Sequence, residues 1–230
     1  MTRVLHELHG RDGHRFSPYC WRTIMALKHK GLDFERAPMK FTDRAAIEPS
    51  GQDRVPVLVD GERWVHDSWT IAEYLEDTYP DAPSLFGGAM GRAQARFFNK
   101  WVDMSVHGRL RALVVPDTFK HAHPDDSDWF RESREAMFGM KLEDMRGDVD
   151  ALKADLHATL EPLRATLETQ PYLCGEAPAY ADYIFFGSLM WQRCSSPLKL
   201  FDAGDPIPPW RARLLAAFDG YAGEAPGYET

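Results

Sequence analysis

The sequence predicts an α/β N-terminal domain followed by an all-α C-terminal domain. Three observations predict this division. First, strand-like runs alternate with two well-capped helices over residues 1–80. Second, residues 81–90 carry a proline, a serine and two adjacent glycines, as linkers commonly do. Third, strand signals nearly vanish over residues 91–230, where apolar residues recur at helical spacing.

The elements of the N-terminal domain follow from periodicity, caps and turns. Asp60-Gly61 between two β-rich runs is a strong hairpin signal, and Pro80 stops the last helix. A crossover helix makes the first two strands parallel, whereas the hairpin adds antiparallel strands. This order, β-α-β and then β-β-α, is a thioredoxin-like pattern. We expect strands over residues 4–8, 32–36, 55–59 and 63–65, and helices over residues 17–30 and 69–78.

The C-terminal domain is predicted to consist of helices alone. A leucine face over residues 152–167 has clear helical spacing, and Pro162 within it favours a kink or a break. The strongly apolar residues 178–193 predict a buried central helix. Further helices are expected over residues 92–115, 125–145 and 208–218.

Composition excludes several functional classes. The formal net charge is −8, and residues 1–80 hold 11 Lys/Arg against 13 Asp/Glu. Neither half therefore has the positive excess that nucleic acid or an anionic membrane requires. No apolar run has membrane-spanning length and no signal-peptide core is visible, so we expect a cytoplasmic protein. Cys20, Cys174 and Cys194 are odd in number and widely spaced, which argues against a disulfide framework or a structural zinc site.

The first helix start is a candidate anion or thiolate site. Ser17 is a strong N-cap residue and Pro18 suits the first helical position, so the helix begins at Ser17. Its unpaired N–H groups and the positive end of its dipole would favour an anion there. Cys20 alone cannot run a dithiol cycle, but a serine hydroxyl can donate a hydrogen bond to a thiolate that arrives on a ligand. The alternative is a helix cap with no further role.

Two further motifs have the same double interpretation. Pro56 belongs at an edge or a strand start, and a cis bond before it would leave the Val55 backbone free to pair with an extended peptide. A trans edge-strand proline is the alternative. Asp67 and Ser68 at the second helix start could bind an α-amino group and an α-carboxylate, or could simply cap the helix.

Together, in this order and at this spacing, the three motifs resemble the glutathione transferase family. The resemblance covers nearly the whole chain, including residues 173–182 before the central helix. One departure is that Ala179 stands where the family usually has a Ser or Thr cap, whereas Asp182 is kept; the lost cap costs about 1 kcal/mol. The similarity is greatest to the fuscin-type class, which includes bacterial β-aryl etherases.

The resemblance implies the glutathione transferase fold, with residues 1–80 binding glutathione as co-substrate and residues 91–230 forming a substrate pocket. Ser17 would activate the thiol, while Val55 and Pro56 would hold the cysteinyl unit. Asp67 and Ser68 would meet the γ-glutamyl end, with Lys40 and Arg54 as candidates for the glycyl carboxylate. A homodimer is expected by the same analogy.

The second substrate is expected to be small, hydrophobic and aromatic, and cleavage of a β-aryl ether is the leading activity. A binding protein without turnover and a glutathione-dependent isomerase or reductase are the alternatives. Cys20 could instead serve as a nucleophile, although its place inside the first turn favours burial. The candidate aromatic walls, for which core packing is the alternative, are Tyr19, Phe97, Phe98, Trp101 and Trp191.

Overall fold

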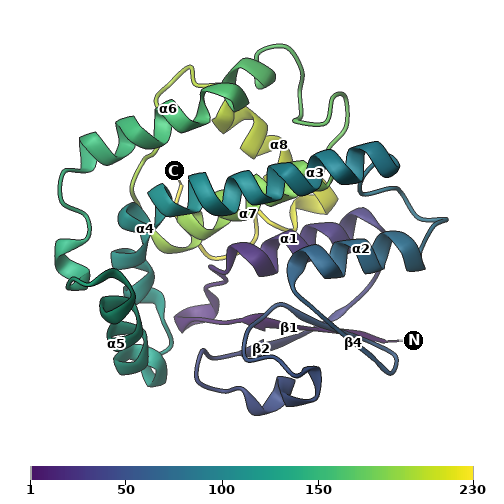
Figure 1. Ribbon diagram of the computed structural model, residues 1–230, viewed down its shortest axis with the longest axis horizontal. Coiled ribbons are helices and arrows are strands. Elements are labelled where there is room, and N and C mark those ends of the chain that lie inside the picture. The colour runs from purple at the N-terminus through teal and green to yellow at the C-terminus, as the bar shows by residue number, and fades with distance from the viewer. Residues whose placement is uncertain (1, 230) are drawn as a thin grey trace.

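The computed structural model describes residues 2–229, in which one four-stranded sheet lies beneath a larger group of helices (Figure 1). The strand order is β2-β1-β3-β4, with β1 parallel to β2 and antiparallel to β3, and with β3 antiparallel to β4. The predicted thioredoxin-like pattern is therefore confirmed. The strands are β1 (Arg3–Leu8), β2 (Glu35–Met39), β3 (Val57–Asp60) and β4 (Arg63–His66).

The helices of this domain are α1 (Pro18–His29) and α2 (Ser68–Thr78), which lie over the same face of the sheet (Figure 1). The short helix η2 (Ala45–Ser50) packs on the opposite face, where Met39, Ile47 and Val57 form a small separate core. Alternation along β3 produces both cores, because Leu58 joins the main core while Val57 joins the small one.

The boundaries of all four strands differ from the prediction, by up to three residues in β2. The strand expected over residues 32–36 is β2, and it begins at Glu35 because the parallel register pairs Val4 with Glu35 and Leu8 with Met39. The residues before Glu35 are needed to return the chain from α1 to the sheet. The hairpin also closes one residue later than expected: Asp60 pairs with Arg63, so Gly61 and Glu62 form its loop.

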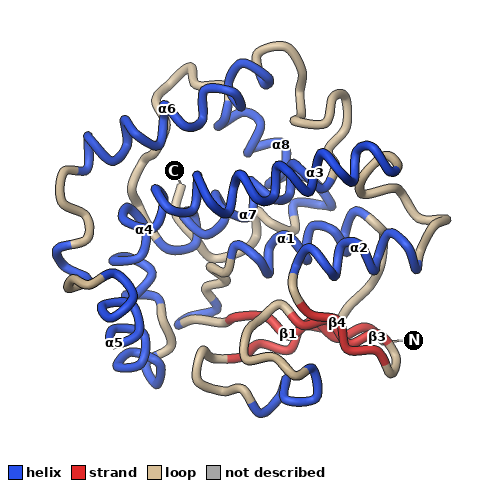
Figure 2. The backbone as a smooth tube through the Cα atoms, viewed as in Figure 1, coloured by secondary structure: helices blue, strands red, loops and turns tan. Residues whose placement is uncertain are grey.

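The second half is helical, as predicted, and over residues 81–229 Figure 2 shows no strand. The expected helix over residues 92–115 is divided by a π-helical turn, η3 (Val102–Val106), and the expected helix over 125–145 ends early at Gly139, where φ is +67°. Pro162 does not break its helix. The helices are α3 (Ala89–Trp101), α4 (His107–His121), α5 (Ser127–Phe138), α6 (Val149–Leu167), α7 (Tyr180–Ser195) and α8 (Ile207–Gly220).

Helix α7 is the buried centre of the molecule and packs along α1. A Cβ atom added to Gly187 would lie 2.4 Å from the carbonyl oxygen of Pro18, so only glycine allows this approach. The start of α7 is held by the buried Asp182 carboxylate, which accepts hydrogen bonds from the N–H groups of Leu173 and Ala179 and from Trp210 Nε1. The contact with Gly187 fixes the first turn of α1 against the helical domain.

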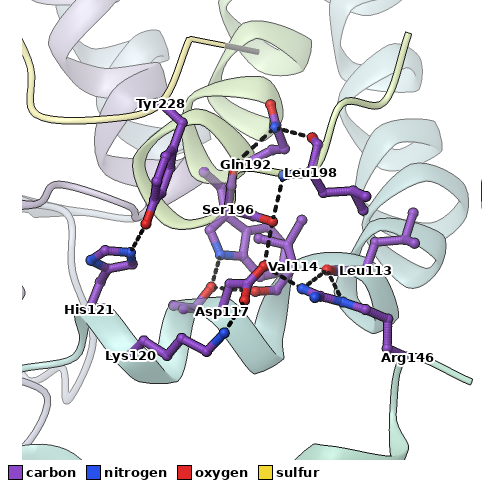
Figure 3. Close-up of polar contacts among 12 residues, drawn as sticks. Leu113, Val114, Asp117, Lys120, His121, Arg146, Gln192, Ser196, Leu198 and Tyr228 are labelled. Carbon is purple, nitrogen blue, oxygen red and sulfur yellow. Dashed lines mark hydrogen bonds and ion pairs between the residues drawn. The ribbon is translucent and has the colours of Figure 1, made fainter.

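A second polar cluster holds the opposite end of α7. Figure 3 shows the Asp117 carboxylate of α4 between Lys120, Arg146 and Ser196, all of which donate to it. Arg146 also donates to the carbonyl oxygen of Leu113. The cluster therefore ties α4 to the chain that follows α7. Among residues 2–229, no helix is both long enough and apolar enough to cross a membrane.

Candidate functional site

The three predicted motifs meet at one end of the sheet. Strand β1 leads into the loop that carries Ser17, β3 begins just after Pro56, and β4 ends just before Asp67. The registers place these ends side by side, because Val57 pairs with both His6 and His66. Antiparallel pairing thus brings together two helix starts and one strand start that are spread over the 50 residues between Ser17 and Asp67.

Ser17 is the N-cap of α1, as the sequence predicts. Its hydroxyl oxygen accepts a hydrogen bond from the Cys20 N–H at 3.3 Å, and its side chain is only 7% exposed. A hydroxyl that accepts this bond keeps its own proton available for a second partner. The helix dipole adds positive potential at the same point. Ser17 is therefore able to stabilise an anion that enters above the helix start.

Cys20 does not take part in such chemistry. The thiol is buried in the main core, and burial raises its pKa to about 12, with the nearby Glu7 carboxylate adding to the effect. A thiol with such a pKa is protonated at neutral pH and is a poor nucleophile. The prediction that Cys20 is buried is confirmed.

The peptide bond between Val55 and Pro56 is cis, which resolves the alternative that the sequence left open. Pro56 is buried and stands one residue before β3. Because β3 lies between β1 and β4, this is a strand-start proline and not an edge-strand proline. Val55 itself is half-buried.

Asp67 and Ser68 form the start of α2. Asp67 caps the helix by accepting from the Thr70 N–H at 3.0 Å, and its backbone has φ of +69° and ψ of 128°. A non-glycine residue in this conformation costs on the order of 1–3 kcal/mol, and such residues cluster at ligand sites. Ser68 is buried, and its carbonyl oxygen accepts from the Tyr180 hydroxyl at 2.7 Å, which anchors the helix start to α7.

The two cations predicted for the glycyl carboxylate, Lys40 and Arg54, differ in how strongly they are already paired. Lys40 Nζ forms an ion pair with Asp125 at 2.8 Å, which raises the lysine pKa and joins the two domains. Arg54 is almost fully exposed, and its nearest carboxylate is that of Asp53 at 3.7 Å. Arg54 is thus the freer of the two, whereas a ligand carboxylate would compete with Asp125 for Lys40.

The candidate aromatic walls fall into two groups. Phe97 is 75% exposed on α3, and Phe98 and Trp101 pack against each other beside the main core. Tyr19 and Trp191, in contrast, both contact His107 through edge-to-face ring packing, with ring centroids 5.5 and 6.0 Å from its imidazole. The second group includes Tyr19, which stands in the first turn of α1.

Sequence reasoning missed the polar residues of the helical domain that meet Tyr19. The Tyr19 hydroxyl lies 3.3 Å from Nδ1 of His107, whose Nε2 lies 2.7 Å from the Ser188 hydroxyl. These residues are 88 and 81 positions apart in the sequence, so no local pattern links them. Arg22 adjoins them, with its guanidinium 4.8 Å from the centre of the Tyr19 ring.

In this protein, two helix starts of a thioredoxin-like domain converge at one end of the sheet, and a helical domain packs against that domain. This arrangement defines the glutathione transferase fold. Comparison with known proteins agrees. The model of the glutathione S-transferase N-terminal domain matches residues 16–78, and that of the C-terminal domain matches residues 93–198. The chain belongs to the glutathione S-transferase family.

Individual relatives are distant. The glutathione S-transferase-like protein ustS of Aspergillus flavus is 32% identical over 138 residues, which span 54% of this chain and 49% of the relative. A glutathione S-transferase of Ceriporiopsis subvermispora, solved in complex with glutathione, superposes with a TM-score of 0.81 at 23% identity, covering 96% of this chain and 98% of that one. The β-etherase LigF from Sphingobium sp. strain SYK-6 has a TM-score of 0.70 at 20% identity, with 97% and 99% covered.

Proposed function

We propose that this protein binds glutathione at this end of the sheet and activates its thiol for attack on an aromatic electrophile. The observation that carries the proposal is the convergence of Ser17, the strand start after Val55-Pro56 and the Asp67-Ser68 helix start. A tripeptide thiol with an amino group and carboxylates offers a partner for each of these groups. The similar structure of the Ceriporiopsis subvermispora glutathione S-transferase, which contains glutathione, supports the same ligand.

The proposed binding mode follows from the groups present. The unpaired N–H groups at the start of α2 and the Ser68 hydroxyl receive the γ-glutamyl carboxylate, and Asp67 receives the α-amino group. The cysteinyl unit pairs with the Val55 backbone as an added strand. Arg54, and Lys40 after exchange of its partner Asp125, attract the glycyl carboxylate.

Ser17 then carries the activation. A free thiol has a pKa of about 8.5 and is mostly protonated at neutral pH. The Ser17 hydroxyl and the dipole of α1 stabilise the thiolate, so the bound thiol ionises more readily. The thiolate attacks the electrophilic carbon and the leaving group departs with the bonding electrons.

For the substrate we propose a β-aryl ether, which the thiolate would cleave to a thioether and a phenol. The likeness of the sequence to the fuscin-type class supports this choice, as does the structural likeness to the β-etherase LigF. A carrier protein without turnover and a glutathione-dependent isomerase or reductase remain as alternatives, and the first experiment separates them.

The test is a pH titration of bound glutathione by thiolate ultraviolet absorbance, in the wild type and in Ser17→Ala. We expect a depressed thiol pKa in the wild type and a rise of about 1 to 2 pH units in the variant, since a hydrogen bond to a charged group contributes about 1.5–3 kcal/mol. The variant should lose about 10²- to 10³-fold in kcat.

Other outcomes point to the alternatives. Binding with an ordinary thiol pKa in the wild type would favour the carrier, and glutathione that is recovered unchanged or oxidised would favour the isomerase or the reductase. Thr169→Ala is a matched control, because its hydroxyl only donates to the Thr166 carbonyl oxygen at an exposed site after α6. It should leave the titration unchanged.

We further propose that two copies associate through α3 and η3. Met90, Phe97 and Met104 are exposed by 77%, 75% and 79%, and they stand seven residues apart, so they share one side of the helix. Phe97→Asp should convert a dimer into a monomer in static light scattering, and a monomeric wild type would contradict the proposal.

Three unpaired thiols suit the reducing cytoplasm as the location of this protein.

A further inference from the structure

Tyr19 has a contact set that thiol activation does not use. It is one of the few large aromatic side chains that remain exposed, at 38%, and it stands in the first turn of α1, two residues after Ser17. One face of its ring is covered by the Arg22 guanidinium. Its hydroxyl reaches across the domain boundary to Nδ1 of His107. Its own ionisation is disfavoured, because burial of the hydroxyl and the Asp103 carboxylate raise the pKa of Tyr19.

His107 is held neutral at the start of α4. Its side chain is almost fully buried, and burial lowers its pKa to about 3, with Arg22 and Arg111 adding to the effect. A neutral imidazole has one N–H donor and one acceptor nitrogen. Ser188 at Nε2 and Tyr19 at Nδ1 therefore face opposite roles.

The nearby carboxylate decides which nitrogen carries the proton. Asp103 Oδ1 lies 3.8 Å from Nδ1 of His107, and a negative charge there favours the tautomer with the proton on Nδ1. Arg22 holds this carboxylate in place with a contact of 2.8 Å. In that tautomer the Ser188 hydroxyl donates to Nε2 and Nδ1–H donates to the Tyr19 oxygen.

The consequence is a tyrosine whose oxygen accepts a hydrogen bond from His107 and whose own O–H proton is kept for a second partner. We propose that Tyr19 is a catalytic residue that donates its proton to the oxygen leaving an aryl ether, and that His107 positions it. This inference rests on the proposed function and adds a second residue, with a separate role, to the action of Ser17.

The proton balance is complete without a further reactant. The thiolate sulfur forms a bond to the carbon, the carbon–oxygen bond breaks, and its electron pair goes to the phenolate oxygen. Tyr19 gives its proton to that oxygen, and Nδ1–H of His107 stabilises the negative charge left on the tyrosine oxygen. The proton released when the glutathione thiol ionised returns to Tyr19 through solvent, so glutathione and ether give thioether and phenol.

The experiment varies the leaving group. α-Aryloxyacetophenones with 4-nitro-, 4-chloro- and 4-methoxyphenol leaving groups are assayed with the wild type and with Tyr19→Phe. Poor leaving groups need the proton most, and general acid catalysis contributes about 10²- to 10⁴-fold. We expect Tyr19→Phe to lower kcat by about 100-fold for 4-methoxyphenol and by less than about 3-fold for 4-nitrophenol, with little change in KM.

Several results would overturn this role. An equal loss of kcat over the whole series would do so, and so would a Tyr19→Phe variant in which the thiol pKa of bound glutathione rises, because Tyr19 would then act on the thiol. If the wild type cleaves no member of the series although it binds glutathione with a depressed thiol pKa, the leaving-group role falls while thiol activation stands. If glutathione does not bind, the proposed function itself falls.

His107 is tested by exchange of the donor. Asn places an amide N–H close to the position of Nδ1–H, whereas Leu places none there. We expect His107→Leu to show part of the leaving-group dependence of Tyr19→Phe and His107→Asn to restore the wild-type dependence. Identical dependence in Leu, Asn and wild type would remove the positioning role. Tyr172→Phe, which removes a hydroxyl between α6 and α7, is the matched control and should leave the dependence unchanged.

Discussion

The two walls of the site arise in different ways. At one end of the sheet, Ser17 and Asp67 are placed by local rules, because each caps the helix that it precedes. The short paired strands bring the two caps together. Across the boundary, Ser188 of α7 contacts His107 of α4, and His107 contacts Tyr19. These contacts form because α7 packs against both α4 and α1. Local rules therefore place the residues of the proposed thiol site, whereas the groups around Tyr19 depend on helix packing.

The largest expected effect concerns the buried hydrogen bonds that hold the start of α7. Asp182→Ala would leave the N–H groups of Leu173 and Ala179 and the Trp210 indole without an acceptor at a buried site. Each unsatisfied buried donor costs about 1–3 kcal/mol, so we expect a loss of about 3–5 kcal/mol in the free energy of unfolding, measured by urea denaturation. A loss below about 1 kcal/mol would show that α7 is not held by this carboxylate.

Ala179→Ser is the local counterpart at the same helix start. It restores a cap hydroxyl to a position that has none, and it should raise the free energy of unfolding by about 1 kcal/mol. The two substitutions together separate what local capping contributes from what the buried network contributes.

The next effect concerns pH. The unfolded chain protonates His107 near pH 6.5, whereas the folded protein does so only near pH 3. Because the unfolded state then binds more protons, stability falls on acidification below about pH 6.5, at about 1.4 kcal/mol per pH unit. Between pH 7 and pH 5 the wild type should lose about 2 kcal/mol more than His107→Asn does. Parallel stability curves for the two proteins would contradict the buried neutral state of His107.

The last effect concerns glutathione binding at the start of α2. Ser68→Ala removes one hydroxyl from the proposed γ-glutamyl site and should weaken glutathione binding roughly tenfold, or about 1.4 kcal/mol, by titration calorimetry. The thiol pKa of bound glutathione should stay at the wild-type value, in contrast to Ser17→Ala. A rise of that pKa in Ser68→Ala would mean that the two helix starts do not have separate roles.

Most of the fold could be predicted because its signals are local. Ser17 before Pro18, the glycine of the hairpin and the leucine face of α6 each act within a few residues, and all of them appear in the structure. The errors occur where pairing or packing overrides a local pattern. The register with β1 moved the start of β2 to Glu35, and the helix containing Pro162 continues through it because one lost hydrogen bond does not outweigh a buried leucine face.

The sequence alone determined the thioredoxin-like order, the helical second half and the three motifs of the proposed glutathione site. Tertiary structure alone decided that these motifs lie at the same end of the sheet, that Lys40 pairs with Asp125, and that His107 contacts Tyr19. The physical reason is the range of each interaction. Caps and turns are satisfied by neighbouring residues, whereas a buried imidazole takes its partners, its charge and its tautomer from helices that are remote in the chain.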